Sequence, residues 1–449
     1  MKTSTKIITI IFILLIIAGG VYWYLFFYGP GNQIDPEMPA GGTTGGFVPL
    51  NAPSGNTGTG TTNNGNQNNN NGNSTSSPTN TVAQNPIPYL RLLSNSPIGG
   101  YGASTTASTT VVRWIDRGRG NVFEAKGDSL EIVTLSNTVL PRMYESVWNK
   151  NITAMIGSLL SSNSDVPTVV YARLNPQATT SKATTSTASS TASTTVTTTS
   201  TPNTNITPYN LKGKNLPENM LAYAVSPKGD KIFMLIKEDG NSSGYIANFD
   251  GTSFSKIFTN PLTQVNVEWP EETTIAITTK GSASHAGYLY FVNTKTGIWK
   301  KILGPIYGLS TRVSKDAKYV LASATGKDQT LVTNVYITGT TTPTDATIRT
   351  LADKCAWGNY YKEIVYCAVS TQQTSAIYPD DWYRGNITSS DKIWQLNVKS
   401  GDIRLVSSIF DKSDRLINAF NLGLDTRDDF LFFMNKDDLS FWSLDLNAK

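Results

Sequence analysis

One segment in the C-terminal part of the chain combines aromatic rings, carboxylates and a guanidinium, the groups that recognise sugars and peptides. Residues 378–385 read Tyr-Pro-Asp-Asp-Trp-Tyr-Arg-Gly. Aromatic rings stack on apolar ligand faces, while charged side chains hydrogen-bond the polar ones. Adjacent residues of an extended chain point to opposite sides, which argues against a paired acid–base catalyst here. The candidate ligand-binding residues are Tyr378, Asp380, Asp381, Trp382, Tyr383 and Arg384.

A second candidate group is basic. Arg113, Arg117 and Arg119 lie close together between expected strands. Two interpretations stay open: the cluster binds an anionic surface polymer, or it belongs to a solvated turn. The whole chain has a formal net charge of only +4, without the basic excess of a nucleic-acid binder, so no nucleic-acid partner is expected.

Histidine chemistry rests on a single residue, His285. One histidine excludes sites built from several histidines, and its own segment, Gly-Ser-Ala-Ser-His-Ala-Gly at 281–287, contains no Gly-x-Ser-x-Gly motif. A peptidase of the propeller-plus-hydrolase kind needs a further catalytic domain, which we do not expect. We therefore predict no catalytic residue, no metal site and no cofactor.

The two cysteines, Cys355 and Cys367, lie twelve residues apart. We expect them on neighbouring strands of one hairpin with its turn at residues 359–362. A register symmetric about residue 361 makes them face each other, within reach of a disulfide. A disulfide indicates an exported domain. Two free buried thiols are the alternative.

The N-terminus predicts a membrane anchor. Residues 7–28 are almost unbroken apolar sequence, long enough to span a bilayer. Lys2 and Lys6 precede the run, which places the N-terminus in the cytoplasm and the rest outside. A cleaved signal peptide ending at residues 18–20 is the alternative, but the apolar run continues beyond that point. We expect a single-pass cell-membrane protein with an extracytoplasmic domain.

The composition distinguishes segments that we expect to be disordered from those that can form a folded core. Of the 449 residues, 39% are hydrophobic and 16% charged, which leaves a large uncharged polar remainder. Residues 29–86 are rich in Gly, Asn, Ser and Thr and cannot bury enough apolar area, so they predict a disordered linker. The Ser/Thr-rich stretch 177–206 predicts a loop insertion or an O-glycosylated stalk.

The remaining residues, 87–449, contain an internal repeat. A strand, a turn and an apolar strand recur with corresponding positions Val225, Trp269, Val313 and Trp357, each step being 44 residues. This period is typical of a four-stranded propeller blade. A third strand follows in each unit, and a fourth often comes after a glycine turn. The Gly, Asn and Asp turns between the strands are typical of hairpins.

The flanks bring the number of units to seven. We place the first from Val112, the second from Tyr144, and the last from near Leu416. The last unit lacks a fourth strand of its own. Residues 88–93 resemble a fourth strand, so we predict that they pair with residues 439–446 and close the ring. The fold class is an all-β, seven-bladed propeller of four-stranded antiparallel blades, preceded by one transmembrane helix and a linker.

The Val-Ser-Pro-Lys-Gly-Asp-Lys-Ile-Phe pattern at 225–233 resembles the WD40-like repeats of TolB-type and peptidase-type propellers. The segments at 112–124, 354–369 and 378–385 are similar to uncharacterised membrane-anchored propellers of uncultured small-genome bacteria. The resemblance implies the fold and no activity. The Trp-Asp dipeptide of true WD40 blades does not occur at the repeat positions.

These observations favour a surface-anchored binding or scaffold module with a protein or glycan at one propeller face. The loop at 371–392, between a second and a third strand, emerges on the face where propellers commonly bind ligands. Alternatively, this loop packs over the channel mouth or a neighbouring blade. Two other functions stay open. An envelope glycosidase or lyase needs several carboxylates converging at the channel. An accessory subunit of a membrane complex needs packing against a partner within the membrane, and the small residues 18–20 are the only close-packing signal in the apolar run.

Overall fold

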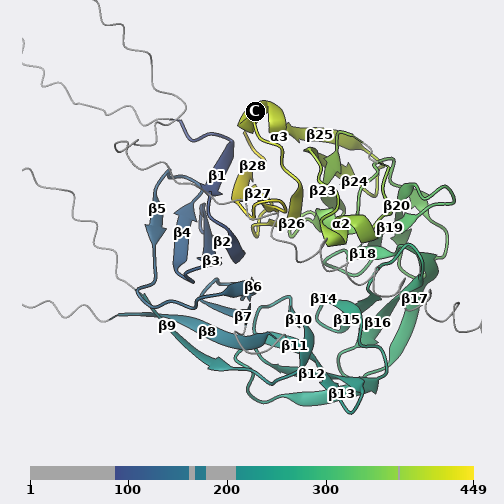
Figure 1. Ribbon diagram of the computed structural model, residues 1–449, viewed down its shortest axis with the longest axis horizontal. Helices are drawn as coiled ribbons and strands as arrows, with labels where there is room; N and C mark the ends of the chain where they lie inside the picture. The colour runs from purple at the N-terminus through teal and green to yellow at the C-terminus, as the bar shows by residue number, and fades with distance from the viewer. Residues whose placement is uncertain (1–85, 161–166, 178–208, 373–374, 449) are drawn as a thin grey trace, which may run out of the picture. The chain divides into compact units, whose positions relative to one another are not determined.

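The computed structural model describes residues 86–160, 167–177, 209–372 and 375–448. Their strands form seven four-stranded antiparallel sheets arranged as the blades of one propeller (Figure 1). No helix in these ranges is long and apolar enough to cross a membrane. The predicted anchor at residues 7–28, the linker to residue 85 and most of the predicted insertion lie outside the described residues.

The strands follow the chain from blade to blade. Blade 1 contains β2 (Ile98–Thr106), β3 (Thr109–Asp116), β4 (Val122–Lys126) and β5 (Ile132–Thr134). Blade 2 contains β6 (Met143–Trp148), β7 (Ala154–Leu159), β8 (Thr168–Pro176) and β9 (Tyr209–Asn215). Blade 3 contains β10 (Met220–Val225), β11 (Lys231–Glu238), β12 (Asn241–Asn248) and β13 (Ser255–Asn260). Blade 4 contains β14 (Val265–Glu271), β15 (Thr274–Thr279), β16 (Ala286–Asn293) and β17 (Trp299–Tyr307).

The last three blades carry the short helices. Blade 5 contains β18 (Ser310–Val313), β19 (Tyr319–Thr325), β20 (Leu331–Ile337) and β21 (Thr344–Asp345). The 3-10 helix η1 (Ala352–Lys354) leads into blade 6, which contains β22 (Cys355–Trp357), β23 (Ile364–Ser370), β24 (Asp391–Asn397) and β25 (Ile403–Ser408). Helix α2 (Asp380–Arg384) lies between β23 and β24, and α3 (Ile409–Ser413) follows β25. Blade 7 contains β26 (Ala419–Leu424), β27 (Phe430–Asn435), β28 (Phe441–Asp445) and β1 (Leu90–Ser94).

The 44-residue period is confirmed. Val225, Trp269, Val313 and Trp357 all lie at or near the end of the innermost strand of blades 3 to 6. The second strand of a blade is buried on both sides, so it reads as a continuous apolar run: residues 232–236 of β11 are all buried. Each blade thus packs both of its faces against neighbours, which a sheet must do to bury its apolar area.

The predicted closure is also confirmed. Strand β1 pairs antiparallel with β28, with Leu90 opposite Leu444 and Leu92 opposite Trp442. The hydrophobic core consists of seven clusters, each between two neighbouring blades, including one between blade 7 and blade 1. The N-terminal strand therefore completes the last blade and joins the two ends of the described domain.

The first blade begins earlier than the sequence suggested. Val112 lies in the second strand, β3, and the innermost strand is β2. Strand β2 reads Ile-Gly-Gly-Tyr-Gly-Ala-Ser-Thr-Thr and shows no apolar alternation. Its glycines permit close approach to blade 2, because a Cβ at Gly102 would lie 2.5 Å from Cβ of Trp148. Packing against β6 rather than strand propensity determines this segment.

The cysteine pairing follows the predicted register. Cys355 in β22 lies directly opposite Cys367 in β23, and a disulfide joins them with their Cα atoms 4.1 Å apart. Both residues are buried. The crosslink joins the two inner strands of blade 6, the blade that carries the 378–385 segment.

Candidate functional site

The loop between β23 and β24 is held against two other blades. The carboxylate of Asp380 accepts hydrogen bonds from Ser282 Oγ at 3.1 Å and the backbone N–H of Ala283 at 2.7 Å, both in the β15–β16 loop of blade 4. Thr325 in blade 5 donates its hydroxyl to the carbonyl of Tyr378 at 2.7 Å. Second-to-third-strand loops and blade linkers share one end of an up-and-down antiparallel blade, which we call the upper face. The loop thus crosses blade 5 on the upper face.

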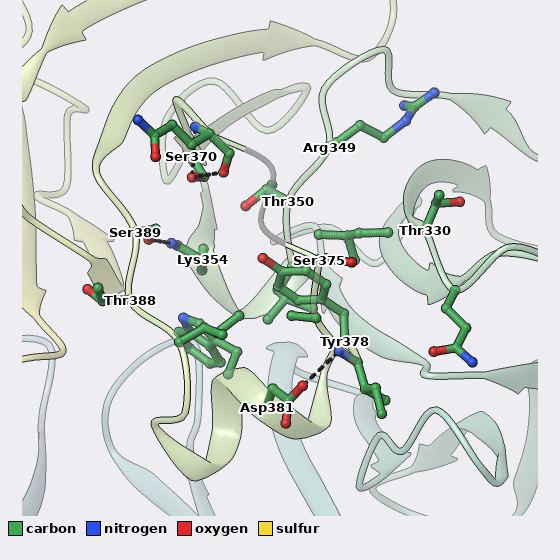
Figure 2. A pocket seen from close by; sticks show the side chains of 18 of the residues that line it. Thr330, Arg349, Thr350, Lys354, Ser370, Ser375, Tyr378, Asp381, Thr388 and Ser389 are labelled. Atoms are coloured by element: carbon green, nitrogen blue, oxygen red, sulfur yellow. Dashed lines mark hydrogen bonds between the residues drawn. The ribbon is translucent and has the colours of Figure 1, made fainter.

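A pocket of about 760 Å³ lies beside this loop, between blades 5 and 6. Figure 2 shows Tyr378 in its middle, with Lys354 and Ser389 to one side and Thr330 to the other. Hydroxyl, amide, apolar and a few charged side chains form the walls. They come from the β19–β20 loop, the linker between blades 5 and 6, and the β23–β24 loop: Lys327, Asp328, Gln329, Thr330, Leu331, Arg349, Thr350, Leu351, Lys354, Ser370, Gln372, Ser375, Ala376, Ile377, Tyr378, Asp381, Trp382, Ile387, Thr388 and Ser389.

Trp382 forms part of the pocket wall, yet only 6% of its surface is exposed. Its indole N–H donates to Asn418 Oδ1 at 3.1 Å. The ammonium groups of Lys436 and Lys354 lie 5.1 Å and 5.9 Å from the ring centroid, within cation–π distance. Trp382 therefore fixes α2 onto blades 6 and 7 and leaves little ring surface for a ligand.

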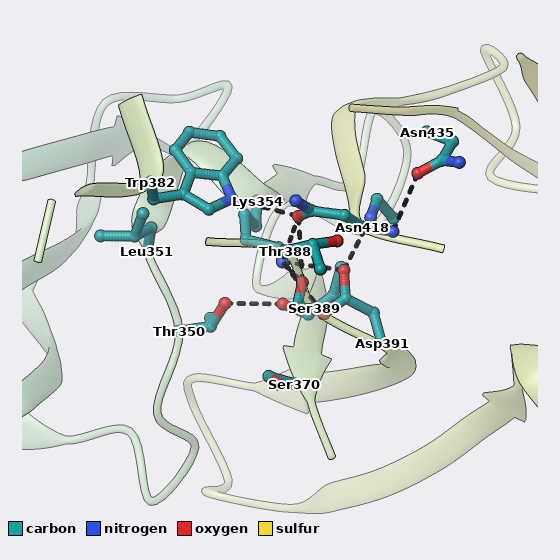
Figure 3. Close-up of polar contacts among 12 residues, drawn as sticks. Thr350, Leu351, Lys354, Ser370, Trp382, Thr388, Ser389, Asp391, Asn418 and Asn435 are labelled. Atoms are coloured by element: carbon teal, nitrogen blue, oxygen red, sulfur yellow. Dashed lines mark hydrogen bonds and ion pairs between the residues drawn. The ribbon is translucent and has the colours of Figure 1, made fainter. Parts of the chain in front are cut away.

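A buried ionic network lies beneath the pocket (Figure 3). Lys354 Nζ contacts Asp391 Oδ2 at 2.8 Å, Ser389 Oγ at 2.8 Å and Asn418 Oδ1 at 3.1 Å. Asp391 Oδ2 also accepts the backbone N–H of Ala419 at 2.7 Å. A buried charge needs such partners, because burial removes its contacts with water and only protein groups can replace them. The network joins η1 and β24 to the first strand of blade 7.

Tyr383, on another side of α2, faces the innermost strands of the ring. Its hydroxyl donates to Asp353 Oδ2 at 2.6 Å. Arg312 in β18 lies between two carboxylates, 3.5 Å from Glu268 Oε1 and 3.8 Å from Asp353 Oδ1. Burial raises the pKa of Glu268, although Arg312 opposes the shift. Burial, reinforced by the Asp353 charge, also raises the pKa of Tyr383.

The structure therefore divides the residues of the 378–385 segment among three places. Tyr378, Asp381 and Trp382 line the pocket. Asp380 anchors the loop on blade 4. Tyr383 belongs with Glu268, Arg312 and Asp353 to a polar group at the innermost strands, which we call the channel cluster. Arg384 keeps two thirds of its side chain exposed, with its guanidinium 4.0 Å from Asp380.

The basic residues of blade 1 lie on a separate part of the fold, and each makes contacts of its own. Arg113 in β3 is 2.8 Å from Glu124 and donates to the carbonyl of Ile152 at 2.8 Å. Arg117 stacks over the ring of Tyr144, 4.7 Å from its centroid. Arg119 is exposed in the turn, where its backbone N–H bonds Asp116.

Most of the pocket wall was missed at the sequence level. Thr330, Arg349, Lys354 and Thr388 come from three loops that carry no common motif. The one available signal was position: these loops all join strands at the upper face of blades 5 and 6. In the described ranges, no group of three His, Cys, Asp or Glu side chains is placed to hold a metal ion.

No protein-family model matches this chain, and no curated protein matches its sequence. Solved structures resemble its fold. One is TolB from Acinetobacter baumannii, at 10% identity and a TM-score of 0.37, covering 72% of this chain and 59% of TolB. Another is the β-propeller domain of the Trilobed protease from Pyrococcus furiosus, at 9% identity and 0.45, covering 79% of this chain and 96% of that domain.

The tricorn protease is similar at 8% identity and a TM-score of 0.46, covering 81% of this chain. This chain spans 34% of the length of that protease and 59% of TolB. Likeness at this level concerns the fold and carries no argument about activity. The described domain is a seven-bladed β-propeller, as its own strands and blades establish.

Proposed function

We propose that this chain is a binding or scaffold module that takes a protein or glycan into the upper-face pocket beside α2. The observation that carries the proposal is the pocket itself. Its volume of about 760 Å³ lies in the range of ligand sites, and it has a tyrosine at its centre and polar groups around its walls. The network of Lys354 and Asp391 gives it a rigid floor, and Asp380 secures the loop that forms its wall.

Site-directed photo-crosslinking in the full chain tests this proposal. A photo-reactive amino acid replaces Thr330, which lines the pocket, or Tyr360, which is 66% exposed in the β22–β23 turn at the opposite end of blade 6. We expect a specific adduct from position 330 and not from position 360. Equal labelling from both positions, or none from position 330 in the native envelope, contradicts the proposal.

We further propose that the propeller is anchored in the cell membrane and lies outside the cytoplasm. Support comes from the apolar run at residues 7–28, the lysines before it and the Cys355–Cys367 disulfide, a bond that persists in oxidising compartments. Extraction of membranes at alkaline pH should leave the full chain in the membrane fraction and should release a variant that lacks residues 7–28. Protease added to intact cells should cleave the β23–β24 loop; protection of this loop until lysis contradicts the proposed location.

The channel cluster favours an envelope glycosidase or lyase as the second candidate function. Glu268 has a raised pKa and lies with Asp353 on either side of Arg312, while Tyr383 contacts Asp353. A raised carboxyl pKa widens the pH range in which the group holds the proton that a general acid donates. The test is hydrolysis or elimination of envelope polysaccharides by the full chain, with loss of activity in Glu268→Gln. Unchanged activity in that variant contradicts this candidate.

A further inference from the structure

The ionic groups of the upper-face pocket are already engaged within the protein. Arg349 makes two contacts of 2.8 Å to the carboxylate of Asp345. Lys354 is paired with buried Asp391. The Asp381 carboxylate accepts hydrogen bonds from the backbone N–H of residue 377 at 2.8 Å and from the side-chain amide of residue 386 at 3.1 Å. A charged ligand would have to break one of these contacts, which leaves its former partner unpaired.

Two further charges, Lys327 and Asp328, are exposed neighbours of opposite sign on the β19–β20 loop. They give this part of the wall no net charge. The pocket therefore lacks the uncompensated cluster of one sign that recognises phosphate, sulfate or carboxylate groups.

Neutral polar groups remain to meet a ligand. The side-chain hydroxyls of Thr330 and Ser375 line the pocket, and no hydrogen bond engages either hydroxyl within the described part of the chain. Gln329 adds an amide. Hydroxyl and amide groups both donate and accept, so they match the hydroxyls of an uncharged ligand in either direction.

The wall also discriminates against an extended peptide. Peptides commonly bind by adding a strand to a sheet edge. Of the pocket residues, only Leu331 and Ser370 belong to strands, and each lies at a strand end. The other wall residues come from loops, η1 and α2, so the pocket presents side chains around Tyr378 and no strand edge.

We infer that the upper-face pocket binds an uncharged carbohydrate, a short segment or end of a neutral glycan, with Tyr378 as its aromatic platform. The inference rests on the proposed function of this pocket and names its ligand class. Sugar rings present C–H groups on their faces and hydroxyls on their edges, and this combination matches a ring surrounded by hydroxyls and amides.

The test uses the full purified chain with neutral glucan, mannan and galactan oligosaccharides, acidic oligosaccharides of the same length, and a peptide library. We expect affinity for at least one neutral oligosaccharide that changes less than about twofold between low and high salt, because no ion pair forms. Tyr378→Ala should weaken it about tenfold or more. Thr330→Trp, which fills the pocket without altering Tyr378, should abolish it. Tyr360→Ala is the matched control, removing an exposed tyrosine at the other end of the same blade.

The outcomes separate the two proposals. Neutral-sugar binding lost in both pocket variants and kept in the control supports the inference. Binding of acidic oligosaccharides or peptides alone, lost in Thr330→Trp, overturns the carbohydrate inference and leaves the pocket's proposed binding function intact. Binding that neither pocket variant changes, or no binding to any probe together with no adduct from position 330, overturns both.

Discussion

Lys354 Nζ lies 2.8 Å from Asp391 Oδ2, and the two side chains are only 5% and 0% exposed. The pair connects the linker before blade 6 to the third strand of that blade. Asn418 extends it to blade 7, because its Oδ1 accepts from both Lys354 and the indole of Trp382. The pocket floor and the junction between two blades are therefore one structure.

This relationship predicts strong destabilisation when one partner is removed. Asp391→Asn leaves the Lys354 ammonium buried without its counter-charge, and we expect the free energy of unfolding to fall by about 3–5 kcal/mol. Lys354→Met combined with Asp391→Leu removes both charges and should be more stable than the single variant. Urea unfolding followed by tryptophan fluorescence measures both. Equal losses in the single and double variants contradict an ionic role for the pair.

The closing strand predicts a contrast between two adjacent leucines. Leu93 is 4% exposed in the cluster between blades 7 and 1, whereas Leu92 is 36% exposed. Leu93→Ala should cost about 2–5 kcal/mol, through lost burial and the cavity left behind. Leu92→Ala should change stability by less than about 0.5 kcal/mol. Similar losses in the two variants would show that β1 does not contribute to the core as described.

The repeat made the blades and their closure predictable from the sequence, since strand alternation and turn residues are local signals. Strand β2 was not predicted, because its glycines permit close packing against Trp148 and leave no alternation of apolar and polar residues. Tyr378, Asp381 and Trp382, which the sequence singled out as candidates, line the pocket. Lys354 was not among the candidates, and its partner Asp391 is 37 residues away. A buried ion pair across a long separation leaves no local pattern, and neither does a wall built from three polar loops.

The disulfide predicts a redox-dependent stability. The bond closes a short loop between Cys355 and Cys367, and the chain-entropy model gives about 2–3 kcal/mol for a loop of this size. Adding a reductant to the wild-type chain should lower its urea midpoint. The Cys355→Ala, Cys367→Ala double variant should not respond to reductant. A wild-type chain that shows the same midpoint in both redox conditions contradicts the predicted contribution.

The channel cluster predicts a pH dependence with a defined sign. Burial raises the folded-state pKa of Glu268 above its ordinary value of 4.5, so the native state keeps a proton that the unfolded chain releases. The wild type should therefore lose stability relative to Glu268→Gln as pH rises from about 4.5 through the folded-state pKa, and level off above it. Chemical unfolding across this range measures the difference. Glu131→Gln, at an exposed carboxyl, is the control, and a pH-independent difference for Glu268→Gln contradicts the shift.

Asp380 and Asp381 are adjacent, and the structure predicts different consequences for the same substitution. Asp380→Ala removes the acceptor for Ser282 and Ala283, so the β23–β24 loop loses its attachment to blade 4. Hydrogen bonds to a charged group contribute on the order of 1.5–3 kcal/mol, so the loop should open and be cleaved faster in limited proteolysis. Asp381→Ala removes contacts only within the loop itself, to residues 377 and 386. It should affect the pocket wall while leaving the blade 4 attachment in place. Equal cleavage rates in the two variants would show that the contact across blade 5 does not hold the loop.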